Sequence, residues 1–249
     1  MRIEQFQIVS GFDPEMDIVL TVGASLKKLA KELSGKVIQL SVPSIAPPDA
    51  PRAIIQSKDT IIHVGLNRFE VITRPPEHVN SAFNTARDFA LSRASNVFER
   101  LHEVGGVYQW MGAICNIKYP KSSKDVPALK HCEGLFDKIL RVNRNGRSLS
   151  SFQVQFGFSE DELYKSYVIT GYENRDIKFS GEIQNSMGIE IDLSQFPITE
   201  SGIELTLDHN NKNSKQKESP QSDLGKILKA MENSLAHLPV QLNLAEEML

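Results

Sequence analysis

The sequence lacks most of the features by which a class of function is recognised. Its 249 residues include only two cysteines and one tryptophan. Cys115 and Cys132 do not have the spacing of a zinc site, and a chain this long does not need a disulfide to fold. None of the patterns HExxH, GxSxG, GxxxxGK[ST] or GxGxxG occurs, so the common metal, nucleophile and phosphate signatures are missing. We therefore predict no cofactor, no metal and no catalytic residue, and favour a protein that is not an enzyme.

Long hydrophobic runs are also missing. No apolar run approaches the roughly 20 residues that are needed to span a bilayer. The first residues, MRIEQFQIVSGFD, have no apolar core of the kind found in a signal peptide. The sequence therefore predicts a soluble, cytoplasmic protein without a membrane partner.

The sequence carries a small excess of negative charge, and its charged residues are unevenly distributed. The formal net charge of −3 gives no general reason to expect a nucleic acid as partner. Residues 116–147, however, carry eight Lys and Arg side chains, and residues 159–208 carry eleven Asp and Glu side chains. This segregation favours adjacent solvated faces, and it also suits self-association or a charged partner.

A long helix is predicted over Glu77–Val104. Apolar residues recur there at steps of three and four, Pro75 and Pro76 precede the pattern, and Gly105 and Gly106 follow it. A second helix is predicted over Asp223–Leu238 and should end at Pro239. Its apolar stripe consists of Leu224, Ile227, Leu228, Met231, Leu235 and Leu238. The stripe can dock on the protein's own sheet, which is our first expectation, or pair with another copy.

Strand patterns surround the long helix. Residues 53–72 predict a three-stranded meander, and residues 107–117 predict a buried central strand. Asn145-Gly146 predicts a hairpin between 138–144 and 147–158. Clean alternation of apolar and polar residues in 187–193 and 203–207 indicates an antiparallel sheet with one buried face.

These patterns predict an α+β fold, in which one or two largely antiparallel sheets pack on one long central helix. We expect an N-terminal sub-domain over 1–117 and an antiparallel β sub-domain over 118–208. A polar linker over 209–222 contains no apolar residue and leads to a C-terminal helical segment over 223–249.

Two candidate sites follow from the residue types. The predicted hairpin carries Lys138, Arg141, Arg144 and Arg147, which could contact phosphates of a nucleic acid, although a solvated hairpin tip is the simpler interpretation. The second candidate is the stripe of the C-terminal helix, as a self-association surface.

Histidines offer a weaker indication of chemistry. His63, His131 and Asp208 could assemble a dispersed hydrolase site, since active sites are commonly built from distant residues. His209 follows Asp208 at a strand end, where we predict a surface turn rather than a metal ligand.

The order of elements resembles that of a known group of proteins. A meander, PRAIIQSKDTIIHVGLNRFEVITRPP, precedes the long helix, and the strand VYQWMGAICNIKY follows it. Then come the segment FQVQFGF, a strand that ends in GIELTLDHN, a polar gap and a terminal helix. In this order the chain resembles a sporadically distributed bacterial family of uncharacterised proteins of about the same length. The resemblance implies a horizontally acquired bacterial gene, as in mobile or defence-related loci, and it assigns no functional residue.

The function predicted from the sequence is that of a non-enzymatic binding or assembly protein, with itself or another protein as partner and a homodimer as the expected state. The alternatives are a nucleic-acid-binding protein that uses residues 138–147, and a hydrolase with a dispersed site.

Overall fold

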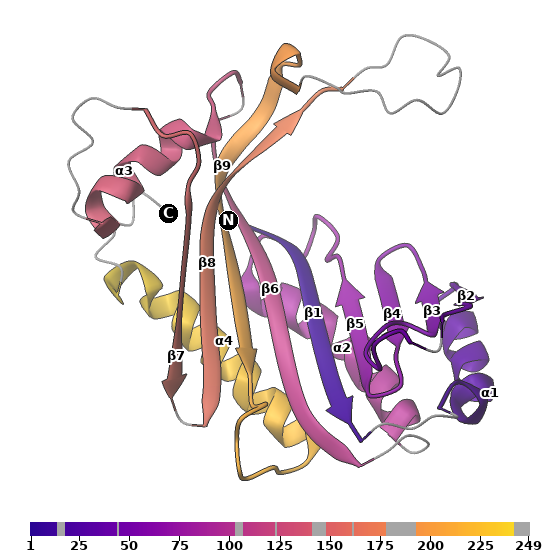
Figure 1. Ribbon diagram of the computed structural model, residues 1–249. Coiled ribbons are helices and arrows are strands. Elements are labelled where there is room, and N and C mark those ends of the chain that lie inside the picture. Colours follow the sequence, from indigo (N-terminus) through magenta and orange to yellow (C-terminus); the bar gives the residue numbers. More distant parts are fainter. Residues whose placement is uncertain are drawn as a thin grey trace.

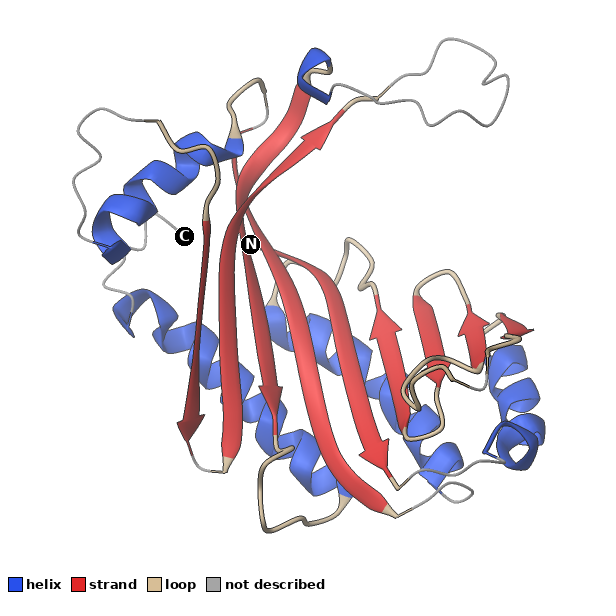
Figure 2. Ribbon diagram, viewed as in Figure 1, coloured by secondary structure: helices blue, strands red, loops and turns tan. Residues whose placement is uncertain are grey.

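The nine described strands form a single antiparallel sheet in this computed structural model (Figures 1 and 2). The structure describes residues 1–13, 18–43, 45–102, 107–122, 124–140, 148–160, 162–177 and 193–241. The strands are β1 (Arg2–Phe12), β2 (Lys36–Gln39), β3 (Ala53–Gln56), β4 (Thr60–Val64), β5 (Arg68–Thr73), β6 (Tyr108–Ser122), β7 (Gln153–Glu160), β8 (Leu163–Arg175) and β9 (Ile198–Asn210). The helices are α1 (Ile18–Glu32), α2 (Phe83–His102), α3 (Ala128–Leu140) and α4 (Pro220–Gln241), and a 3-10 turn spans Leu193–Gln195.

The order of strands shows an internal repeat. Across the sheet the strands run β2-β3-β4-β5-β1-β6-β9-β8-β7. Read outward from the centre, β1, β5, β4 and β3 therefore correspond to β6, β9, β8 and β7. Along the chain each half has the order strand, helix, strands, helix, with β2 as an additional strand in the first half. The two halves meet where β1 pairs with β6 antiparallel, as a local two-fold relation requires.

The helices correspond in the same way. Helix α2 packs on β1 and β5, and α4 packs on the equivalent strands β6 and β9. Alternate side chains of each strand point to this face, because successive residues of a strand face opposite sides. Phe6 of β1, Cys115 of β6 and Leu207 of β9 are fully buried there. Ala86 and Ala90, one helical turn apart on α2, are also buried, and their small side chains let the helix lie close to the sheet.

The α+β class and the antiparallel sheet predicted from the sequence are confirmed. The central position of one long helix is not: α2 has 20 residues, α4 has 22, and both lie behind the sheet (Figure 1). The predicted sub-domain boundary after residue 117 falls inside β6, and both halves contribute to the same sheet.

Two predicted local structures differ from the observed ones. Residues 138–140 belong to α3 and not to a hairpin strand, and β7 pairs with β8 instead. Asn145 and Gly146, the turn of the predicted hairpin, lie outside the described residues. Helix α3 has an amphipathic pattern that buries Cys132 and Leu135 against the sheet. The predicted end of the second helix at Pro239 is also wrong, because α4 continues to Gln241.

The connection between β9 and α4 is shorter and better anchored than the predicted linker. It spans residues 211–219. The side-chain amide of Asn211 donates to Asp223 Oδ2 at 2.7 Å, and Ser214 Oγ bonds Glu162 Oε2 at 2.7 Å. Within the described residues, no helix is both long enough and apolar enough to cross a membrane.

Gly202 allows β6 and β9 to approach each other closely. A Cβ at this position would lie 2.2 Å from the carbonyl oxygen of Tyr119, beside a register shift between Pro120 and Ser122. Backbone atoms cannot move aside as a flexible side chain can, so we expect Gly202→Ala to lower the free energy of unfolding by about 1–3 kcal/mol, as overpacking does. Urea denaturation measures the change.

The matched control is Gly23→Ala in α1, where a Cβ would meet nothing within 4 Å. Alanine is the better helix former, so this control should keep or raise stability. Equal stability of the Gly202→Ala protein and the wild type would contradict the close approach.

Candidate functional site

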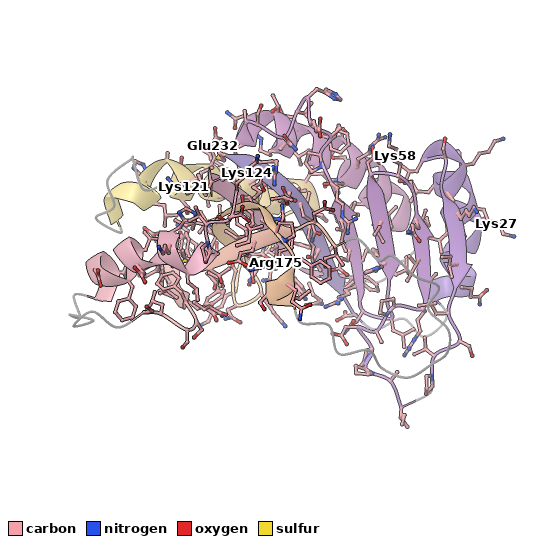
Figure 3. The ribbon with its side chains drawn as sticks, turned by 90° about the horizontal axis from the view of Figure 1, so that it is seen from above. Lys27, Lys58, Lys121, Lys124, Arg175 and Glu232 are labelled. Carbon is pink, nitrogen blue, oxygen red and sulfur yellow. The ribbon has the colours of Figure 1, made fainter. Side chains whose placement is uncertain are left out.

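The predicted basic hairpin is not assembled as expected. Lys138 lies in helix α3, and Arg141, Arg144 and Arg147 lie outside the described residues. Figure 3, which views the molecule from above, places Lys121, Lys124 and Arg175 on one half and Lys27 and Lys58 on the other. These labelled cations are therefore spread along the molecule, and the described residues give no direct support to a nucleic-acid surface.

The predicted self-association stripe faces the chain's own core. Leu224, Ile227, Leu228, Met231 and Leu238 are buried, and Leu235 packs against them. Helix α4 contacts β6, β9 and α2 of the same chain. Five of the six side chains are therefore buried and Leu235 is partly buried within the chain's own core.

The dispersed hydrolase site is also not assembled. His63 on β4 and Asp208 on β9 are separated by four strand spacings, or about 19 Å. The Nε2 atom of His131 lies 3.1 Å from Ser201 Oγ, and Ser201 is seven residues from Asp208 along β9, which is about 23 Å. Among the described residues, no three His, Cys, Asp or Glu side chains are placed to hold a metal ion.

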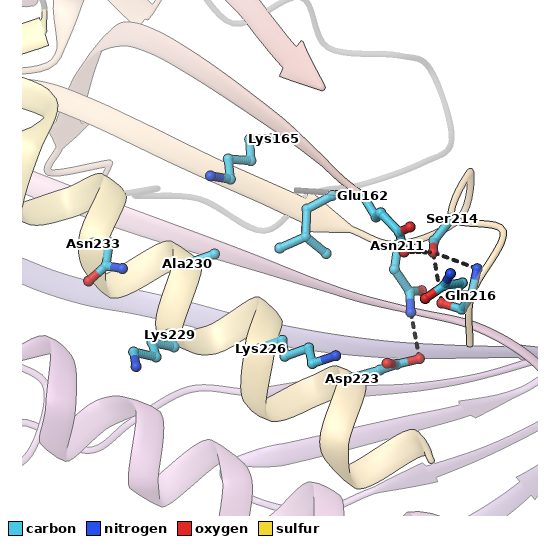
Figure 4. A pocket seen from close by; sticks show the side chains of 11 residues that line it. Glu162, Lys165, Asn211, Ser214, Gln216, Asp223, Lys226, Lys229, Ala230 and Asn233 are labelled. Atoms are coloured by element: carbon cyan, nitrogen blue, oxygen red, sulfur yellow. Dashed lines mark hydrogen bonds between the residues drawn. The ribbon is translucent and has the colours of Figure 1, made fainter. Parts of the chain in front are cut away.

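A groove runs between α4 and strand β8, and we call it the α4 groove. It consists of two adjoining hollows of about 260 and 510 Å³ that share Lys165 and Asn233. Figure 4 shows the first hollow, with the hydrogen bonds of Asn211 and Ser214 at one end and Lys226 and Lys229 along the helix.

The cations in the α4 groove do not converge on one point. Lys165 Nζ donates to Glu160 Oε2 at 2.7 Å, and Lys226 Nζ donates to Glu218 Oε1 at 2.5 Å. Each ammonium group therefore has a carboxylate of its own, and both carboxylates are well exposed. This arrangement suits a solvated groove better than a binding site for an anion.

A buried hydroxyl–imidazole cluster lies at the base of the groove. Tyr167 donates a hydrogen bond to Ser234 Oγ at 2.8 Å, and His209 Nε2 lies 3.0 Å from the same oxygen. His209 is fully buried on β9, so the surface turn predicted for it is wrong. Burial, together with the charge of Lys165, lowers the pKa of His209 to about 4, and the ring is therefore neutral near pH 7.

His209 and Ser234 are arranged like the Ser–His pair of a hydrolase. His209 Nε2 lies 3.0 Å from Ser234 Oγ, which also accepts a hydrogen bond from Tyr167. A backbone contact with Asp208 raises the pKa of His209, but burial outweighs it. All three side chains are buried, so the cluster contributes to the core.

The uncovered face of the sheet carries two further polar networks. Arg2 donates to both carboxylate oxygens of Glu200, at 2.9 and 2.7 Å, and Tyr172 donates to Glu200 at 3.1 Å. His63 Nδ1 lies 2.8 Å from Glu70 Oε2. Burial opposes ionisation of Glu70, but His63, Arg68 and Gln7 outweigh it and keep the pKa of this carboxyl below its usual value. The first network reaches from β1 across β6 to β9, and the second joins the neighbouring strands β4 and β5.

The two edges of the sheet differ in a way that bears on binding. Strand β2 is short, with four residues that include Lys36. Strand β7 at the opposite edge has eight residues, QVQFGFSE, and most of its side chains are exposed. Within the described part of the chain, β7 pairs only with β8, so its outer backbone groups face no other strand.

The sequence showed the apolar character of β7 but not its place at the edge. The position of a strand in the sheet depends on which other strands pair with it, and the local alternation of residues does not contain that information. Ser234 was overlooked because a serine within a helical pattern has no distinctive neighbours.

No family model matches the chain, and no curated protein matches it.

The neutral imidazole of His209 makes stability depend on pH. In the unfolded chain the ring has an ordinary pKa of about 6.5 and takes up a proton between pH 6.5 and 4, whereas the folded protein does not. This contribution to stability is therefore complete above about pH 6.5 and is lost as the pH falls toward 4, by about 3 kcal/mol. Denaturant unfolding at pH 7 and at pH 4.5 measures the loss.

The variant His209→Gln separates this effect from that of the carboxylates, because glutamine can donate to Ser234 but does not titrate. We expect the difference in stability between the wild type and this variant to shrink between pH 7 and pH 4.5. A constant difference would mean that His209 is not held neutral.

Proposed function

We propose that this protein is a non-enzymatic assembly protein that forms a homodimer through strand β7. The observation that supports the proposal is that two equivalent strands differ: one has a described strand paired at its outer edge and the other does not. Strand β3 and strand β7 occupy the same place in the two halves of the sheet, and the outer edge of β3 is covered by β2. The second half has no described strand in that place, and β7 of a second copy would fill it.

The chemistry of the edge supports this pairing. Proteins commonly protect an exposed edge strand with proline, lysine or a short length. Strand β7 has none of these, and Glu160 at its end is its single charge. Phe158 leaves 53% of its surface exposed, next to Phe156 and Tyr167. An unprotected edge of this length is a template for another strand.

Antiparallel pairing of two β7 strands also keeps equivalent side chains on the same face of the combined sheet. Residues that oppose each other in such a pair lie on the same face of the sheet, so a two-fold axis must join positions of equal parity. An axis through Gly157 places Phe156 opposite Phe158 of the second copy, and Gln155 opposite Ser159. Aromatic pairs across strands stabilise a sheet, and no like charges meet. The helices of both copies would lie on the same side.

The wider context of this proposal comes from the sequence alone. We propose a cytoplasmic protein of the bacterial family that the order of elements resembles, with association in mobile or defence-related loci. A nucleic-acid partner would have to use Arg141, Arg144 and Arg147, and no described contact favours it.

Light scattering of the purified chain tests the dimer. We expect a mass of twice 27.8 kDa for the wild type. The double variant Gln155→Lys and Ser159→Lys places lysines opposite each other across the two-fold axis, on side chains that are exposed in the monomer. Repulsion should weaken the dimer at least tenfold, and the weakening should be relieved at high salt.

The matched control is Ile38→Lys on β2, an exposed apolar residue at the other edge. It should leave the dimer intact. A monomeric wild type at concentrations of about 100 μM or above, or equal dissociation of both variants, would overturn the proposal.

A further inference from the structure

A cavity of about 200 Å³ lies between helices α2 and α4, above strand β6. Leu91 and Phe98 of α2, Met111 of β6 and Leu224 of α4 line it with apolar groups. Ser95 of α2 contributes a hydroxyl group, and Gly225 of α4 contributes backbone alone. Pro220 and the solvent-exposed Gln221, at the start of α4, complete the lining. The cavity is separate from the α4 groove, with which it shares no residue.

The walls of this cavity are held in place. Arg87 Nη1 of α2 donates to Glu232 Oε2 of α4 at 2.9 Å, one to two turns from the cavity. Phe98, Met111 and Leu224 are buried members of the main core. Because Arg87 near the start of α2 meets Glu232 late in α4, the two helices run antiparallel and the cavity lies between their other ends.

Gly225 lies on the open side of the cavity, where it is exposed to solvent. A Cβ at this position would meet nothing within 4 Å, and no neighbouring atom requires its absence. Apart from proline, glycine is the least favourable residue within a helix, so a larger side chain here would stabilise α4 and cover the mouth of the cavity.

We propose that this cavity binds a small uncharged molecule with an aromatic or short aliphatic body and one hydrogen-bonding group. Apolar cavities of about 150 Å³ stay dry and take up a benzene-sized ligand, so a cavity of about 200 Å³ has room for one substituted ring. No Lys, Arg, Asp, Glu or His side chain lines it, which excludes a charged ligand. Ser95 supplies the partner for the single polar group.

The probes are p-cresol and toluene, which share a ring and a methyl group and differ in the hydroxyl. Calorimetric titration of the full chain should show saturable binding of p-cresol, with weaker binding of toluene. Both should raise the melting temperature, because a ligand that binds the folded state alone stabilises it. The methyl NMR signal of Met111 should shift with the same dissociation constant, which locates the binding in this cavity.

Two variants distinguish binding in the cavity from nonspecific binding elsewhere on the protein. Gly225→Leu should cover the mouth of the cavity, reduce the affinity for both probes at least tenfold and leave the melting temperature of the free protein equal or higher. The control Gly23→Leu lies in α1, where a Cβ also meets open space, and should bind as the wild type does. Gly225→Ala, a smaller change, serves in the same way if the leucine variant does not fold.

Ser95→Ala tests the chemical class. It should remove the preference for p-cresol over toluene while toluene still binds. The inference is overturned if neither probe binds the wild type saturably, if Gly225→Leu and Gly225→Ala bind as the wild type does, or if the Met111 methyl signal stays unchanged at saturation.

Discussion

The pairing of β1 with β6 is the interaction on which the rest of the structure depends. It joins two halves of similar order into one sheet, through a ladder from Arg2–Lys118 to Phe12–Tyr108 with two register shifts. Each half alone would be a four- or five-stranded sheet covered on one face by two helices, a small layer with limited core. Joined, the halves bring α2 and α4 side by side on one face and bury the central strands beneath them. Burial of that shared face is what favours the single nine-stranded sheet.

The same arrangement explains how the described polar clusters are paired. Antiparallel strands place alternate residues on a covered face and an uncovered face. On the covered face a polar group has to be satisfied internally, as Ser234 is by Tyr167 and His209. On the uncovered face, charged groups such as Arg2 and Glu200 pair across strands. In both places these described groups form their hydrogen bonds within the protein.

The sequence predicted the elements that depend on local residue patterns. It missed the features that depend on which strands pair with one another. The meander of 53–73, the central strand β6 and the apolar stripe of α4 each follow from periodicity, and each was predicted. The first strand of the predicted hairpin was wrong at residues 138–140, because the helix of 128–140 was overlooked. The chain order could not show that residues so far apart as Phe6 and Cys115 are neighbours, nor that β7 ends the sheet. For the same reason the dispersed site of His63, His131 and Asp208 was conceivable until the strand order separated its members.

The cavity and the open edge have a common origin in the incomplete symmetry of the two halves. Where the equivalent helices α2 and α4 meet, their residues differ, and Leu91 and Ser95 of α2 line one cavity with Gly225 of α4. Where the halves differ by one strand, the outer edge of β3 is covered by β2, whereas β7 pairs with no other described strand than β8. The fold gains its core from the symmetric pairing of β1 with β6. The two departures from symmetry are the places at which we propose that a second molecule binds, because symmetric pairing within the chain leaves them open.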